Sequence, residues 1–143
     1  MPADDYGTAN IIGGFRRKIA HYYGDPVRRF LLLAAAILVV ALPVYPNLLP
    51  FGVSYQVIVA VVLVVFAALT NPLRRWTLAW DAGLALAGLL MSEITAVNEY
   101  AASTWPLFLV RELLAFVFLF ALYFSIKTLR AMTLHQTGKP IDR

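Results

Sequence analysis

The sequence has no cysteine and only two histidines, and 14% of its 143 residues are charged. The missing cysteines exclude disulfides, thiolate metal ligands and cysteine nucleophiles. His21 and His135 lie outside the apolar runs without a second metal ligand at a usable spacing, so we predict neither a metal site nor haem ligation. P-loop, dinucleotide-binding and G-x-S-x-G motifs are also missing. We therefore expect no cofactor and no enzyme activity. A lipid-modifying enzyme is the least favoured class, because the sequence shows no pair of nucleophile and base.

Apolar residues make up 61% of the chain, and they gather in four runs long enough to cross a bilayer. We predict that all four are helices, because in lipid the backbone polar groups must be bonded within their own segment. The approximate ranges are 26–44, 51–70, 76–97 and 105–126. Short connections make consecutive helices antiparallel neighbours. The sequence thus predicts an all-α integral membrane protein with a four-helix antiparallel transmembrane bundle over 26–126 and a cytoplasmic tail over 127–143.

The distribution of basic residues predicts the orientation of this bundle. Eleven of the twelve Lys and Arg residues flank the runs on one side, and the two opposite loops contain none. The positive-inside rule places that side in the cytoplasm. We therefore expect a multi-pass protein of the cell membrane with both termini cytoplasmic. Because the basic residues border the apolar runs, they favour anionic lipid over nucleic acid as a partner.

The N-terminal segment 1–25 combines cations with apolar residues at roughly helical spacing. This pattern predicts a short interfacial helix that lies on the inner leaflet of the bilayer. The Gly13–Gly14 pair weakens a helix, so a disordered basic arm is the alternative. The first transmembrane run is short and spans only if its own two arginines snorkel to the interface. The residues that we expect to contact anionic lipid are Arg16, Arg17, Lys18, Arg28 and Arg29.

Four ionisable residues lie inside the predicted spans, namely Asp81, Glu93, Arg111 and Glu112. Each charge in hydrocarbon costs roughly 2.5 to 3.5 kcal/mol on insertion scales, so each needs a partner or a function. The helix rise puts Glu93 and Arg111 at similar depths on adjacent helices, which predicts an ion pair between them. Such a pair could fix the register of the bundle, belong to an ion or proton pathway, or contact another subunit. Glu112 lies about 100° from Arg111 around its helix and has no obvious cation.

Asp81 lies near the cytoplasmic end of the third run, one turn beyond Trp76 and close to Arg74 and Arg75. The favoured interpretation is an interfacial carboxylate that balances those arginines. The alternative is a cytoplasmic gate or an entry site for ions.

Small residues recur every four positions along the third run, which is typical of close helix packing in lipid. Ala79, Gly83 and Ala87 form one stripe, and Gly88 and Ser92 begin another. Two stripes predict that this helix packs on two sides, one of which is available to a second copy of the protein.

These observations favour one function and leave an alternative. The favoured function is an oligomeric ion or proton channel or transporter component, with Glu93, Arg111 and Glu112 lining or gating a polar path near the outer half of the membrane. The alternative is a non-catalytic accessory or assembly subunit that docks on a larger membrane complex through the small-residue stripes.

Overall fold

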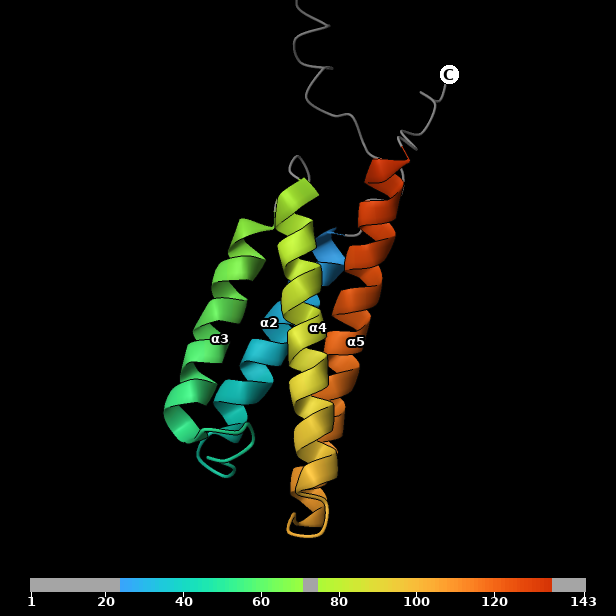
Figure 1. Cartoon of the computed structure of the whole chain (residues 1–143). Helices are drawn as coiled ribbons and strands as arrows, with labels where there is room; N and C mark the ends of the chain where they lie inside the picture. Colours follow the sequence, from blue (N-terminus) through green and yellow to red (C-terminus); the bar gives the residue numbers. More distant parts are fainter. Residues whose placement is uncertain (1–23, 71–74, 135–143) are drawn as a thin grey trace, which may run out of the picture.

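The structure is a computed structural model that describes residues 24–70 and 75–134, and the chain forms four α-helices within these ranges (Figure 1). They are α2 (Gly24–Ala41), α3 (Gly52–Leu69), α4 (Arg75–Asn98) and α5 (Trp105–Thr133). Consecutive helices run in opposite directions. The prediction of an all-helical chain is therefore confirmed. The interfacial helix predicted within 1–25 lies outside the described residues, apart from the first residues of α2.

Three of the helices, α3, α4 and α5, are long and apolar enough to cross a membrane. α2 is not among them, because its 18 residues include Asp25, Arg28 and Arg29. Many large apolar side chains stay exposed on the outer faces, for example Val61 of α3 and Ile94 of α4. An apolar surface of this extent is stable in lipid and unfavourable in water. The chain is thus a membrane protein.

The ends of the helices follow local signals in the sequence. α3 begins after a turn in which Phe51 and Gly52 both have positive φ, 74° and 82°. α5 has Pro106 in its first turn, where a backbone N–H would have no helical acceptor. The predicted end of this helix at residue 126 is too early, because α5 continues to Thr133. The apolar run ends at residue 126, but residues 127–133 contain no proline or glycine that would break the helix.

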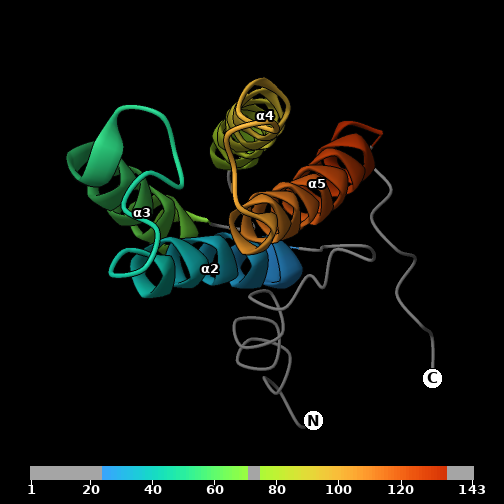
Figure 2. The same cartoon turned by 90° about the horizontal axis from the view of Figure 1, so that it is seen from below.

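The four helices form an open array in the order α3, α2, α5, α4 (Figure 2). α2 packs on α3 and on α5, and α4 packs mainly on α5, whereas α3 and α4 have little direct contact. Within the chain α4 has one main packing side, and its second packing side, for which a second copy of the protein is available, stays a prediction. A pocket of about 80 Å³ lies between α3 and α4, lined among others by Tyr55, Leu63, Ala87 and Met91.

The array has two ends of different character. We call one the basic end, where α2 and α4 begin and α3 and α5 end, because it carries Arg28, Arg29, Arg75 and Arg130. We call the other the loop end, which is formed by the connections 42–51 and 99–104.

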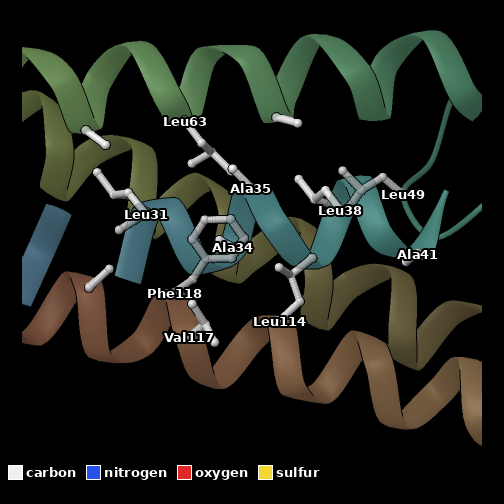
Figure 3. Packing of buried hydrophobic residues seen from close by; sticks show 14 of the residues in the cluster. Leu31, Ala34, Ala35, Leu38, Ala41, Leu49, Leu63, Leu114, Val117 and Phe118 are labelled. Carbon is white, nitrogen blue, oxygen red and sulfur yellow. The ribbon is translucent and has the colours of Figure 1, made fainter. Parts of the chain in front are cut away.

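The core lies where α2 and α5 meet, with α3 and α4 added on either side (Figure 3). Leu31, Ala34 and Leu38 of α2 and Leu114 and Phe118 of α5 are almost completely buried. On α4, the position that touches Phe118 is a glycine, Gly88, so the backbone of α4 approaches the aromatic ring closely. This contact sets the register between α4 and α5.

Candidate functional site

Arg111 joins both connections of the loop end to α5. Its side chain is 1% exposed, although it is the largest of the fully buried side chains. In the first connection, Nε donates to the carbonyl of Leu48 (3.1 Å) and Nη2 to the carbonyl of Asn47 (3.0 Å). In the second, Nη1 donates to the hydroxyl of Ser103 (2.8 Å), and Nη2 pairs with Oε2 of Glu99 (2.5 Å). The guanidinium therefore clamps two loops that are far apart in the sequence.

The predicted ion pair between Glu93 and Arg111 is wrong, because Arg111 pairs with Glu99. Side chains of an α-helix tilt toward the N-terminus of their own helix. Since α5 begins at the loop end and α4 at the basic end, Arg111 reaches toward the loops and Glu93 is tilted away from them. Similar depth of the two backbones thus does not bring these side chains together. The guanidinium of Arg111 is bonded to the two loops, and its predicted role in a polar path of an oligomer stays a prediction.

Glu93 lies on α4 and Glu112 on α5, two helices that pack on each other. Both side chains are partly exposed, and neither forms an ion pair within residues 24–70 and 75–134. Met91 lines the pocket against α3, and Glu93 is about 200° further around α4. The seam between α4 and α5 that holds the two carboxyl groups therefore opens on the side away from α3. We call these two residues the carboxylate pair.

Asp81 is buried near the basic end and is not the interfacial carboxylate that the sequence suggested. Its side chain is 1% exposed, and the hydroxyl of Thr70 at the end of α3 lies 2.9 Å from Oδ2. Oδ1 has no hydrogen-bond partner in the described part of the chain. Arg75 is exposed and forms no ion pair with Asp81, and Arg74 lies outside the described residues. Asp81 therefore faces the interior of the helix array.

The two small-residue stripes of α4 have different surroundings. The stripe that begins with Gly88 and Ser92 packs inside the chain, since Ser92 is 1% exposed and Gly88 meets Phe118. The stripe of Ala79, Gly83 and Ala87 is exposed, and a Cβ placed on Gly83 would meet nothing within 4 Å. One stripe is thus a packing face of the protomer, and the other is left uncovered.

The residues predicted to contact anionic lipid are only partly described. Arg28 and Arg29 are exposed at the basic end, and Arg28 also donates from Nε to the carbonyl of Ala67 (2.8 Å). Arg28 therefore satisfies a backbone acceptor near the end of α3 in addition to facing the interface. The other three, Arg16, Arg17 and Lys18, lie outside the described residues.

The contacts of three polar residues at these sites were not predicted from the sequence. Glu99 is the only charged residue in the connections 42–51 and 99–104, which was the signal that it neutralises Arg111. Thr70 stands directly before Asn71–Pro72 and places a hydroxyl at the end of α3. Gln56 is the one amide in an otherwise apolar run; it is completely buried, and Nε2 donates to the carbonyl of Leu38 (2.8 Å).

Comparison of the chain with protein-family models, curated proteins and solved structures gives no match. Within residues 24–70 and 75–134, no three His, Asp or Glu side chains are grouped so that they could hold a metal ion. The chemistry that the described sites offer is the binding of protons or single cations by carboxyl groups inside a membrane-embedded helix array.

Proposed function

We propose that the protein is a component of an oligomeric ion or proton channel or transporter. The observation that carries this proposal is the carboxylate pair, Glu93 and Glu112, two partly exposed acidic side chains on the packed helices α4 and α5 that form no ion pair among the described residues. An ionised carboxylate in hydrocarbon is costly, and a second one nearby adds repulsion. A bound proton or cation relieves both costs. Intramembrane carboxylates that lack a protein cation are typical of ion and proton pathways.

Packing within the protomer supports an oligomer. Next to the carboxylate pair, on the side of the basic end, the α4–α5 contact contains the buried apolar side chains Phe118 and Ala121, and the polar side chains Ser125 and Thr128 are buried only further along α5. A single chain therefore offers no continuous polar route along this contact. Because the seam opens outward, a second copy that covers it would place the carboxyl groups between subunits and away from acyl chains. We propose that the path lies at such an interface.

The proposed topology has four spans with both termini in the cytoplasm. α2 is short, but it alternates in direction with α3, α4 and α5. The exposed cations Arg28, Arg29, Arg75 and Arg130 all lie at the basic end, which the positive-inside rule assigns to the cytoplasm. Snorkelling of Arg28 and Arg29 extends the reach of α2 to the interface. This topology supports a multi-pass protein of the cell membrane in contact with anionic lipids.

The test is proton and cation flux into liposomes that contain the purified protein. We expect flux above that of protein-free liposomes, and we expect Glu112→Gln and Glu93→Gln to reduce it toward that background. Glutamine keeps the size of the side chain but cannot be ionised, so it removes the exchangeable charge. The matched control is Asp25→Asn, which removes an exposed acid at the basic end and should leave the flux unchanged.

Wild-type flux equal to that of empty liposomes would refute the transport proposal. Wild-type flux that survives the double change Glu93→Gln and Glu112→Gln would show that the path lies elsewhere. Reconstitution efficiency is compared by the amount of protein recovered in each liposome preparation, so that a difference in flux is assigned to the site.

A second function, an accessory or assembly subunit, is favoured by the uncovered stripe of α4. Ala79, Gly83 and Ala87 are exposed, and small residues at this spacing let another helix approach closely in lipid. A partner helix could therefore seat on α4 without any change inside the protomer.

Substitution of Gly83 tests this alternative cleanly. We expect Gly83→Leu to leave the stability of the protomer unchanged, because nothing lies within 4 Å of the added Cβ. The same change should abolish cross-linking of α4 to its partner in membranes. Ala68→Leu on the exposed surface of α3 is the control, since it adds a similar volume elsewhere. Cross-linking that is equal in wild type and Gly83→Leu would argue against docking through this stripe.

A further inference from the structure

We propose that Asp81 is a proton-binding site, in which the carboxyl group carries a proton and donates it in a hydrogen bond to the hydroxyl of Thr70. The site lies near the basic end between α3 and α4, about 18 Å along α4 from Glu93. The proposal does not depend on the carboxylate pair, and it holds whether or not the protein transports ions.

The hydrogen-bond geometry at Thr70 supports a proton on Asp81. The hydroxyl oxygen of Thr70 lies 2.9 Å from the carbonyl oxygen of Phe66 and 2.9 Å from Oδ2 of Asp81. A hydroxyl has one hydrogen to donate but can also accept. If Asp81 carries a proton, it donates to Thr70, and Thr70 donates to Phe66. Both short contacts are then hydrogen bonds, with one hydrogen in each.

The ionised form of Asp81 would have too few hydrogen-bond donors at this position. A carboxylate can accept about four hydrogen bonds, yet from residues 24–70 and 75–134 this one would receive at most the single hydrogen of Thr70. Oδ1 has no partner in the described part of the chain, and the side chain is 1% exposed, so it is shielded from bulk water. A buried charge with one donor is strongly unfavourable compared with a neutral carboxyl group.

The charged groups on the elements around Asp81 do not compensate for it within the described residues. α3 contributes no charged residue. The nearest cation of α2, Arg28, is bonded through Nε to the carbonyl of Ala67. On α4 and α5 the cations near this end are exposed, and Lys127 lies over the ring of Tyr123, 5.6 Å from its centroid. These cations are Arg75, Lys127 and Arg130, and the structure shows no ion pair between any of them and Asp81 within the described ranges.

A proton fits this site better than a metal ion. Hard cations such as Ca²⁺ and Mg²⁺ take six or more oxygen ligands. Here one carboxyl group and one hydroxyl converge, and no group of three acidic or histidine side chains occurs in the described ranges. A proton needs only one oxygen that binds it and one acceptor for its hydrogen bond. The carboxyl group of Asp81 supplies the first, and the hydroxyl of Thr70 supplies the second.

The bound proton also has a mechanical consequence. The bond between Thr70 and Asp81 links the end of α3 to α4, two helices that otherwise touch little. Loss of the proton would leave a buried charge that is stabilised by entry of water, which loosens this link. Proton occupancy of Asp81 therefore controls how firmly α3 is held against α4.

Infrared spectroscopy of the full-length protein in lipid bilayers at neutral pH tests the proposal. A protonated carboxyl group gives a C=O band separate from those of amides and carboxylates. We expect Asp81→Asn to remove one such band. We expect Thr70→Val to keep the band but shift it to higher frequency, because the acid loses its hydrogen-bond acceptor. Glu93→Gln and Glu112→Gln identify any bands of the carboxylate pair and should leave the band of Asp81 in place.

The proposal is overturned if the wild type shows no acid band that Asp81→Asn removes. Should Asp81→Asn fail to fold, Thr70→Val decides the question, and an unshifted acid band in that variant also overturns it. These readouts do not involve flux. A missing flux with an intact band of Asp81 would refute the transport proposal alone, and the reverse result would refute only the proton site.

Discussion

Replacement of Arg111 by leucine is expected to lower the free energy of unfolding by about 3–5 kcal/mol, because three acceptors in the loops lose their donor and each unsatisfied buried polar group costs about 1–3 kcal/mol. The side chain is 1% exposed and donates to the carbonyls of Asn47 and Leu48 and to Ser103. Leucine fills part of the space but supplies no donor, so these acceptors lose their partner at the edge of the apolar region. The two connections of the loop end are then no longer tied to α5.

Unfolding of the purified variants in mild detergent, induced by heat or denaturing detergent, measures this loss. Arg111→Lys should be intermediate, because an ammonium retains the charge but lacks the planar fork that reaches both loops. Glu99→Gln should cost less than about 1 kcal/mol, since Glu99 is 49% exposed and the pair is partly solvated.

The comparison of these variants separates two explanations of the buried arginine. If Arg111→Leu is as stable as the wild type, the clamp contributes nothing to folding. If Glu99→Gln is as unstable as Arg111→Leu, the ion pair and not the set of carbonyl bonds is what matters. The predicted order is leucine least stable, lysine intermediate and Glu99→Gln close to wild type.

The predicted helix ranges differ from those of the structure by at most three residues at every end except the last, which is seven residues later at Thr133. Apolar run length and the Pro and Gly signals determine where helices start and stop, and these are local properties of the sequence. The open order of α3, α2, α5 and α4 was not predictable in this way. Short connections predict that consecutive helices are neighbours in space, and this is wrong for α3 and α4, which have little contact. Every pair of helices has apolar faces that could pack, so the sequence does not select among the possible pairs.

The sequence indicates which charged residues lie inside the spans, but it does not indicate which residues they contact. Depth along a helix follows from residue counting, so Glu93 and Arg111 were placed at similar depth. The direction of each side chain is set by the direction of its helix, which separates these two and brings Arg111 to Glu99. The environment of Asp81 depends on how α3 sits against α4, which no local pattern in the sequence encodes.

Shortening Phe118 to alanine is expected to destabilise the protein by about 3–5 kcal/mol, which is typical of removing a buried aromatic ring. Phe118 is 2% exposed and lies at the centre of the core, in contact with Gly88 of α4. In lipid the loss comes from the contacts of the ring, since transfer of apolar groups out of water contributes little between helices. Loss of the ring also removes the contact that sets the register of α4.

A double-mutant cycle with Gly88 shows whether this contact is as close as the structure indicates. An added Cβ at Gly88 would lie 2.6 Å from the ring, so Gly88→Ala alone should cost about 1–3 kcal/mol as an overpacked site. In the background of Phe118→Leu, which is smaller at that point, the same change should cost clearly less. Coupling between touching residues is commonly about 0.5–3 kcal/mol.

Gly83→Ala is the matched control for this cycle, because Gly83 lies on the same helix with nothing within 4 Å of an added Cβ. It should be neutral or stabilising by up to about 1 kcal/mol, as alanine favours helix over glycine. Equal effects of Gly83→Ala and Gly88→Ala would contradict the close approach of α4 to α5. Additive effects of Gly88→Ala and Phe118→Leu would likewise show that Gly88 is not retained to accommodate the ring.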